Sequence, residues 1–271
     1  MKYIFLSLFI FIKFVYADET ITIGATPIPQ AQILKQVKPI LKKQGIDLVI
    51  TEFNDYIQPN LLVWQKQLDA NFYQHRPFLQ QFNKEHGIDL VELTDVEIEP
   101  MGFYASNDQK FKEFVSSKKL DKLAKVREDS LLLVGVPNDT TNEGRALLLL
   151  EKNGLIKIKK GVSYPTKTDI IANPFNIVIK ELDSAMLPRA LISKQLSFAV
   201  INSNYALDAN LNPVKDAIFI EAKDSPYVNI IVVRKESLNL PKMKKLVTAI
   251  HSKEVRDFIK KTYKNSIIAT F

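Results

Sequence analysis

Residues 131–152 read LLLVGVPNDTTNEGRALLLLEK. They combine a strand pattern with a helix pattern, and this succession recurs along much of the chain. The apolar run Leu131–Val136 predicts a buried strand, and the apolar residues over Thr141–Lys152 predict a helix. Thr140 stands three residues before Glu143, which is the spacing of a capping box, so we expect the helix to start there. A buried strand that leads directly into a helix is the repeating unit of an α/β fold.

The same alternation of strand and helix continues on both sides of this segment. Strands are expected at residues 21–24, 46–53, 177–182 and 198–202, and helices at residues 34–41, after Pro59, from Pro77 to Gly87 and at residues 188–193. We expect further strands between Asp89 and Ala105, a late strand pair at residues 218–222 and 227–234, and two closing helices. This alternation predicts parallel sheets covered by helices on both faces, arranged as two α/β lobes.

The two lobes are assigned to residues 18–105 plus 225–271 and to residues 106–224. The chain would then cross between the lobes near residues 102–106 and 222–225, which we expect to act as hinges.

Composition excludes several kinds of chemistry. The 271 residues are 46% hydrophobic and 25% charged, as in a globular protein with a core in each lobe. The sequence has no cysteine, which excludes disulfides, thiol nucleophiles and cysteine metal sites. The eight glycines never form GxGxxG or GxxxxGK, and the three histidines do not form HExxH. We therefore expect no metal and no cofactor.

The N-terminus resembles a secretory signal. A positive start is followed by the apolar run Ile4–Val15, and Ala17 supplies a small residue for cleavage. The alternative is a membrane helix, but the run is shorter than the roughly 20 residues that a span needs, and Lys13 interrupts it. We expect cleavage after Ala17 and an exported, periplasmic, soluble product without a lipid anchor. Its lysines are spread over separate helical faces, so nucleic acid is not an expected partner.

Polar residues at the ends of predicted strands mark a candidate ligand site, because ligands of open α/β sheets bind at such ends. Asn142 and Arg145 lie three residues apart on one face of the first helical turns after residue 140. An arginine at a helix N-terminus suits a carboxylate ligand. The alternative is that Arg145 pairs with a structural acid such as Asp183.

Two asparagines and an aromatic cluster extend this candidate site. Asn202 follows an apolar strand and Asn229 lies within another, so each amide must find partners in loop backbone or in a ligand. Tyr56 and the run Tyr73-Gln74-His75 stand at strand-to-helix junctions. His75 is either a hydrogen-bonded structural group or, in a secreted enzyme, a general base.

Seven short motifs in order make the chain similar to a known family. They are Gly24–Pro27, Asn54–Tyr56 with Gln58–Asn60, Asp69–His75, Pro137–Asp139 with Thr141–Arg145, Leu187–Arg189, Val200–Asn202 and Ser225–Asn229. Over essentially the whole mature chain, the sequence resembles the NlpA-type methionine-binding proteins of bacterial ABC importers.

The resemblance implies a fold, a function and partners. The fold is a two-lobed periplasmic binding protein, type II-like, with the ligand cleft between the lobes. Such a protein is not an enzyme: as a monomer it captures methionine and delivers it to an ABC permease and its ATPase in the inner membrane. The other functions considered are binding of a different apolar amino acid, binding of a methionine-containing dipeptide, and a secreted enzyme that uses His75.

The resemblance also implies roles for individual residues. Arg145 would hold the ligand carboxylate, Asn202 and Asn229 would bind its amino and carboxylate groups, and Asn142 would support this polar end. The side-chain pocket would be lined by Tyr56, Tyr73, His75 and Phe78. The sequence departs from the family in lacking the lipobox cysteine and in carrying Phe78 where tyrosine is common.

Overall fold

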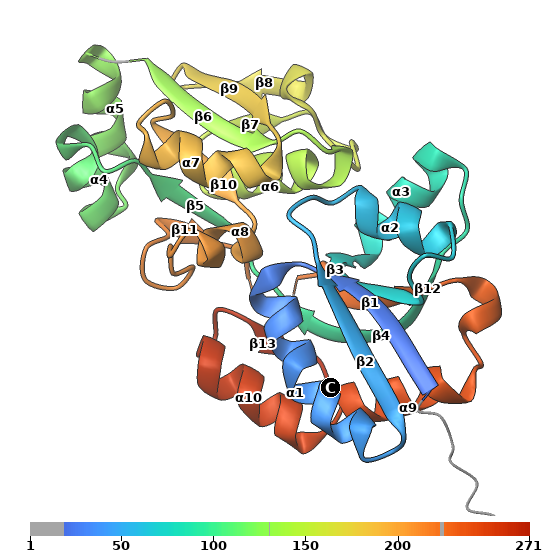
Figure 1. The fold of residues 1–271 in the computed structure, drawn as a ribbon. Coiled ribbons are helices and arrows are strands. Elements are labelled where there is room, and N and C mark those ends of the chain that lie inside the picture. The colour runs from blue at the N-terminus through green and yellow to red at the C-terminus, as the bar shows by residue number, and fades with distance from the viewer. Residues whose placement is uncertain (1–18, 130, 223–224) are drawn as a thin grey trace, which may run out of the picture.

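A computed structural model describes residues 19–129, 131–222 and 225–271, so the predicted signal peptide and its cleavage site lie outside the described residues. The chain forms two lobes, each built on its own sheet (Figure 1). Within the described ranges, no helix is both long and apolar enough to cross a lipid bilayer.

The first lobe is built on a mixed sheet with the strand order β13-β4-β12-β3-β1-β2. Its strands are β1 (Glu19–Ala25), β2 (Ile46–Glu52), β3 (Ala70–His75), β4 (Val91–Ile98), β12 (Val228–Val233) and β13 (Ile268–Ala269). Its helical segments are η1 (Pro27–Ala31), α1 (Gln32–Lys42), α2 (Gln58–Trp64), α3 (Arg76–His86), η5 (Lys235–Ser237), α9 (Pro241–Ile250) and α10 (Lys253–Tyr263). Helices α1, α9 and α10 share one apolar core with the sheet. Helices α2 and α3 pack together in two smaller cores.

The second lobe is built on a sheet with the strand order β11-β5-β10-β6-β9. Its strands are β5 (Gly102–Ala105), β6 (Leu132–Pro137), β9 (Ile177–Leu182), β10 (Phe198–Ile201) and β11 (Phe219–Ile220), with a separate hairpin of β7 (Lys157–Ile158) and β8 (Ile170–Ala172). Its helical segments are η2 (Gln109–Phe111), α4 (Lys112–Ser117), α5 (Leu120–Asp129), α6 (Thr140–Lys152), η3 (Lys167–Asp169), η4 (Ser184–Met186), α7 (Leu187–Ile192) and α8 (Ser203–Asp208). Helices α4 to α6 contribute to one apolar core and α7 and α8 to another.

The parallel pairs predicted by the strand and helix alternation form one side of each sheet, up to the edge strands β2 and β9. β1 pairs in parallel with β2 and β3, and β6 pairs in parallel with β9 and β10. The sheets are nevertheless mixed, because β12 runs antiparallel to β3 and β4, and β5 runs antiparallel to β10.

The predicted late strand pair is wrong. β11 pairs with β5 in the second lobe, whereas β12 lies between β3 and β4 in the first lobe. Apolar patterning marks both segments as strands but does not specify the sheet that each one joins. The chain therefore crosses between the lobes after β11, which ends at Ile220, and before β12, which begins at Val228. It also crosses at residues 99–101, since β5 already belongs to the second sheet.

Two helix predictions also need correction. The N-cap of α6 is Asp139, whose carboxylate accepts the backbone N–H of Asn142, so Thr140 and Glu143 do not form a capping box. Glu143 instead accepts the backbone N–H of Lys167. In the first lobe, a proline inside a helical pattern predicts a kink or a break at Pro39, but α1 continues through this residue from Gln32 to Lys42.

Candidate functional site

A buried pocket lies where the two lobes meet, with an empty volume of about 340 Å³. Its lining comes from β3, α3, β12 and the loop before α2 in the first lobe, from α6 and the start of α8 in the second lobe, and from Glu99 in one crossing segment. The lining residues are Tyr56, Tyr73, Gln74, His75, Phe78, Glu99, Asn142, Asn202, Ser203, Asn204 and Asn229. We call this the inner pocket. Every site residue predicted from the sequence lines it except Arg145.

One side of the inner pocket is aromatic. The ring centroids of Tyr56, Tyr73 and Phe78 lie 5.7–6.0 Å from one another, two of the three pairs edge to face. The Tyr73 hydroxyl donates to the backbone carbonyl of Tyr56 at 2.9 Å, and the Tyr56 hydroxyl donates to Oδ1 of Asn204 at 2.6 Å. Burial raises the pKa of both phenols, which therefore stay neutral. The rings offer an apolar surface whose polar ends are already hydrogen-bonded.

His75 links this aromatic side to the second lobe. Its Nδ1 accepts the backbone N–H of Phe78 at 3.1 Å, which caps α3. The proton therefore sits on Nε2, which donates to Oδ1 of Asn142 at 3.2 Å. Burial and the nearby Arg145 charge lower the pKa of His75 to about 3, so the ring is neutral. Both ring nitrogens are bonded to the protein, an arrangement that does not suit a general base.

A relay of hydrogen bonds orients the amides in the second lobe. The Asp139 carboxylate accepts both the backbone N–H and the side-chain Nδ2 of Asn142, each at 3.0 Å. Oδ1 of Asn142 consequently faces Asn202 and accepts its Nδ2 at 3.0 Å. This leaves Oδ1 of Asn202 buried on the pocket side with no hydrogen-bond partner among the described residues. A buried acceptor without a donor indicates a place for a ligand N–H group.

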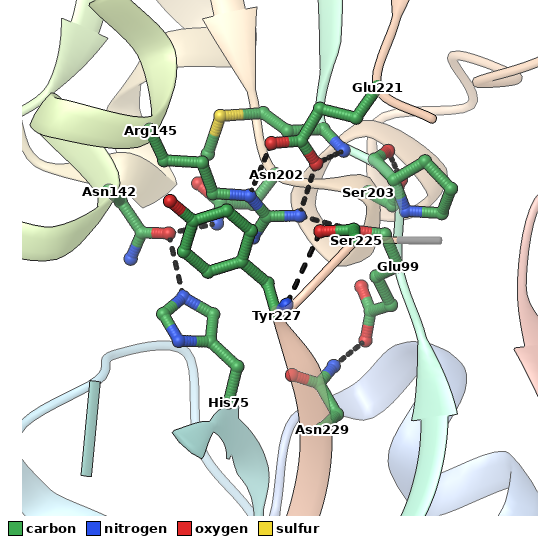
Figure 2. Close-up of polar contacts among 12 residues, drawn as sticks. His75, Glu99, Asn142, Arg145, Asn202, Ser203, Glu221, Ser225, Tyr227 and Asn229 are labelled. Atoms are coloured by element: carbon green, nitrogen blue, oxygen red, sulfur yellow. Dashed lines mark hydrogen bonds and ion pairs between the residues drawn. The ribbon is translucent and has the colours of Figure 1, made fainter. Parts of the chain in front are cut away.

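Arg145 is buried behind this relay and pairs with an acid that the sequence analysis did not identify (Figure 2). Its Nε and Nη2 donate to the two carboxylate oxygens of Glu221 at 2.8 and 2.6 Å, and Nη2 also donates to the backbone carbonyl of Glu99 at 2.7 Å. The guanidinium lies over the ring of Tyr227, 4.4 Å from its centroid. Asp183, the alternative partner considered from the sequence, instead accepts the backbone N–H of Ala185.

Two further acids at the base of the inner pocket are not among the residues predicted from the sequence. Glu97 and Glu99 lie two residues apart at the end of β4, and both are buried. Asn229, placed opposite Glu97 on β12, donates its Nδ2 to both carboxylates, at 3.0 and 2.7 Å. The signal in the sequence was the pair of acids in Val96–Glu99, which alternation along a strand places on one face.

A second, outer pocket adjoins the inner one and shares Tyr56 and Phe78 with it, with an empty volume of about 810 Å³. Acidic residues of both lobes line it together with aromatic rings. Its lining includes Asp55, Phe82, Glu85, His86, Asp139, Asp183 and Tyr205.

Two lobes joined by two crossing segments, with a buried pocket between them, define the class of the periplasmic substrate-binding proteins. Comparison with known proteins then gives the family: the NlpA lipoprotein family matches residues 21–271, and the chain belongs to it. The D-methionine-binding lipoprotein MetQ of Salmonella typhi is 40% identical over 250 residues, which cover 92% of this chain and 87% of that one.

Solved structures agree with this family. A nutrient-binding protein from Burkholderia cenocepacia, bound to methionine, is 41% identical with a TM-score of 0.82, covering 93% of this chain and all of the other. An ABC transporter periplasmic substrate-binding protein from Coxiella burnetii is 34% identical with a TM-score of 0.80, covering 92% and 99% of the two chains.

Proposed function

We propose that this protein is the methionine-binding component of an ABC importer, which captures methionine in the inner pocket and delivers it to a membrane permease and its ATPase. The observation that carries the proposal is the composition of one buried pocket. It combines an aromatic wall with two acceptors for an ammonium group, the Glu99 carboxylate and the free Oδ1 of Asn202. The names of the relatives support the same ligand.

The ligand ammonium is assigned to the polar end of the pocket. Glu99 supplies the negative charge, and Asn202 supplies a neutral acceptor whose direction the amide relay fixes. Asn229 holds the Glu99 carboxylate in place through its Nδ2. Charge-assisted hydrogen bonds of this kind are about twice as strong as neutral ones.

The methionine side chain is assigned to the wall of Tyr56, Tyr73 and Phe78. A flexible thioether packs favourably against the edges of aromatic rings, by about 0.3–1.5 kcal/mol for each contact. Phe78, which replaces the tyrosine common in the family, leaves this wall without a third hydroxyl.

Arg145 is the cation assigned to the ligand carboxylate. Glu221 occupies Nε and Nη2, which leaves Nη1 without an acceptor among the described residues. A carboxylate bound through Nη1 would therefore make one hydrogen bond to Arg145 rather than the two-pronged contact that a free guanidinium offers. The Glu221 pair and the Tyr227 ring would hold the guanidinium in position.

The function proposed is binding without a reaction. His75, the general base of the alternative enzyme hypothesis, uses both ring nitrogens within the protein and is neutral. We place the protein in the periplasm as a monomer without a lipid anchor. Relatives in the family are named lipoproteins, whereas this sequence contains no cysteine to carry a lipid.

The test is calorimetry of the purified mature protein with L-methionine, D-methionine, methionine amide and N-acetylmethionine, together with mass spectrometry of any ligand released on denaturation. Methionine should bind, and loss of either the charged carboxylate or the charged ammonium should weaken binding at least tenfold. At about 100 times the dissociation constant, methionine should add roughly 2.7 kcal/mol to the free energy of unfolding. No heat and no stabilisation with any of the four compounds would contradict the proposal.

The outer pocket favours one second candidate ligand, a methionine-containing dipeptide. It shares Tyr56 and Phe78 with the inner pocket, and its volume is large enough for another residue. Including glycylmethionine and methionylglycine in the same titrations separates the two candidates. Tighter binding of either dipeptide than of methionine would favour this alternative.

A further inference from the structure

Two buried carboxyl groups at the base of the inner pocket share the same hydrogen-bond donors. Gln30 donates its Nε2 to Oε1 of Glu97 at 3.1 Å and also to Oε1 of Glu99. Asn229 donates its Nδ2 to the same two oxygens. With Nε2 directed at the two acids, Oε1 of Gln30 accepts the hydroxyl of Thr26. All of these amide hydrogens therefore point at one oxygen of each acid.

The second carboxyl oxygen of Glu97 differs from the first in its hydrogen bonding. Oε2 of Glu97 is buried and has no donor among the described residues. An ionised carboxylate with one bare oxygen, beside a second carboxylate, is strongly disfavoured in a buried site. The two carboxyl groups lie close together, because their Oε1 atoms accept from the same two amide nitrogens, and a proton on Glu97 would remove the repulsion between two carboxylates.

Within the part of the chain that the structure describes, no charged or titratable neighbour of the pair compensates a negative charge on Glu97. Arg145 is the cation that acts on Glu99, and it already pairs with Glu221. Tyr56 and Tyr263, the phenols near the pair, are neutral because burial raises their pKa values. Glu99 receives further support from the backbone N–H of Asn204, which Glu97 does not. The proton therefore belongs on Glu97 and the negative charge on Glu99.

We propose that Glu97 is a neutral carboxylic acid whose O–H donates to Glu99, and that it thereby holds Glu99 as a single anion for the ligand ammonium. Glu97 is then a positioning residue, and the polar end of the pocket carries one negative charge, matched to a ligand with one positive charge. The second half of this inference rests on the proposed function, whereas the protonation of Glu97 does not.

The experiment has a ligand-free arm and a binding arm. Infrared spectra at pH 8, where exposed carboxyl groups are ionised, should show a protonated carboxyl band in the wild type. The band should disappear in Glu97→Gln and persist in Glu113→Gln, because the side chain of Glu113 on the second lobe is 73% exposed. Absence of the band in the wild type, or its persistence in Glu97→Gln, would overturn the protonation.

Calorimetry with methionine completes the test. Glu97→Leu cannot donate to Glu99 and should weaken binding at least tenfold, whereas Glu97→Gln keeps an N–H donor and should restore the dissociation constant to within about threefold of wild type. Glu99→Gln should weaken binding at least tenfold, because it removes the anion. A Glu97→Gln variant that binds as weakly as Glu99→Gln would show that Glu97 is itself needed as an anion. If the wild type does not bind methionine, the proposed function fails while the infrared result still decides the protonation of Glu97.

Discussion

At the scale of single residues, the protonation state of Glu99 sets the charge at the polar end of the inner pocket. Burial raises the pKa of Glu99 to about 7, against the support of Gln30, Glu97 and Arg145 for its ionised form. The ammonium of an amino acid favours the ionised form, so binding must pull the proton off wherever Glu99 is still protonated. His75 stays neutral over this range, because its pKa is lowered to about 3.

We therefore predict that methionine affinity is level above pH 7 and falls as the pH drops below it, by up to about tenfold for each pH unit. The measurement is the dissociation constant by calorimetry between pH 5.5 and 8.5, with net proton release on binding near pH 7. The Glu99→Gln variant is the control and should bind weakly at every pH. A pH-independent affinity in the wild type would mean that Glu99 does not meet the ammonium.

A second prediction concerns the amide relay. In Asp139→Asn, an amide N–H2 replaces one acceptor of Asn142, which lets the Asn142 amide reverse and turns the free oxygen of Asn202 away from the ligand. We expect about tenfold weaker methionine binding, from a buried polar group left unpaired. Asparagine remains a good N-cap, so α6 should still begin at the same residue.

Asp183→Asn is the matched control for the relay. Asp183 also caps a helical segment at the outer pocket, through the N–H of Ala185, but it contacts no amide of the inner pocket. Its substitution should leave methionine affinity unchanged. Equal losses of methionine affinity in Asp139→Asn and Asp183→Asn would show that binding depends on negative charge at the mouth of the cleft and not on the orientation of Asn202.

The site residues that the sequence predicts correctly are those with a local signal. Tyr56, His75, Asn142 and Asn202 stand at strand ends beside helix starts, which is where such folds bind ligands. Glu97 and Glu99 are not predicted, because two acids in an alternating strand resemble a solvent-facing edge. Only the packing of η1 and β12 over them shows that they are buried, and that packing joins segments about 70 and 130 residues away along the chain.

At the scale of elements, Glu221 links the two crossing segments to α6. Glu221 pairs with Arg145 of α6 and also accepts the backbone N–H of Met101 in the other crossing segment at 2.8 Å. The backbone N–H of Glu221 in turn donates to the carbonyl of Met101 at 3.0 Å. The sequence could not reveal this, because Glu221 lies in the first strand of the predicted late pair, whereas the two strands belong to different sheets.

This arrangement predicts that Arg145 contributes to stability as well as to binding. Arg145→Ala leaves the largely buried Glu221 carboxylate without its cation and should lower the free energy of unfolding by about 3–5 kcal/mol. Arg145→Lys should recover part of it, because a point charge cannot engage both oxygens and the Glu99 carbonyl. Urea unfolding of these variants is the measurement.

The double variant Arg145→Met, Glu221→Leu separates the two roles. Replacing both charges by apolar groups of similar size should restore most of the lost stability, because neither buried charge is left unpaired. Methionine binding should stay weak, since the cation assigned to the ligand carboxylate is gone. A double variant that binds methionine like the wild type would show that Arg145 is purely structural.

At the scale of the whole molecule, the inner pocket exists only while the lobes are together. Its walls come from β3 and α3 on one side and from α6 and α8 on the other, and hydrogen bonds such as His75 to Asn142 and Tyr205 to the carbonyl of Asn54 run between the lobes. Away from the pocket, Thr140 donates to Glu85 across the outer edge of the cleft. A buried ligand can enter only if these contacts open, and the two crossing segments allow this with little change inside either lobe.

We predict, as the last test, that methionine shifts the protein towards the closed arrangement. Small-angle scattering of the wild type should give a smaller radius of gyration at saturating methionine than without it, because the ligand binds groups of both lobes at once and so favours the state in which they meet. The Glu99→Gln variant, measured at the same methionine concentration, should compact less in proportion to its weaker binding, which excludes a general effect of the solute. Identical scattering curves for the wild type with and without methionine, at a concentration where calorimetry shows saturation, would mean that the lobes are already closed in solution and that binding proceeds without a hinge motion.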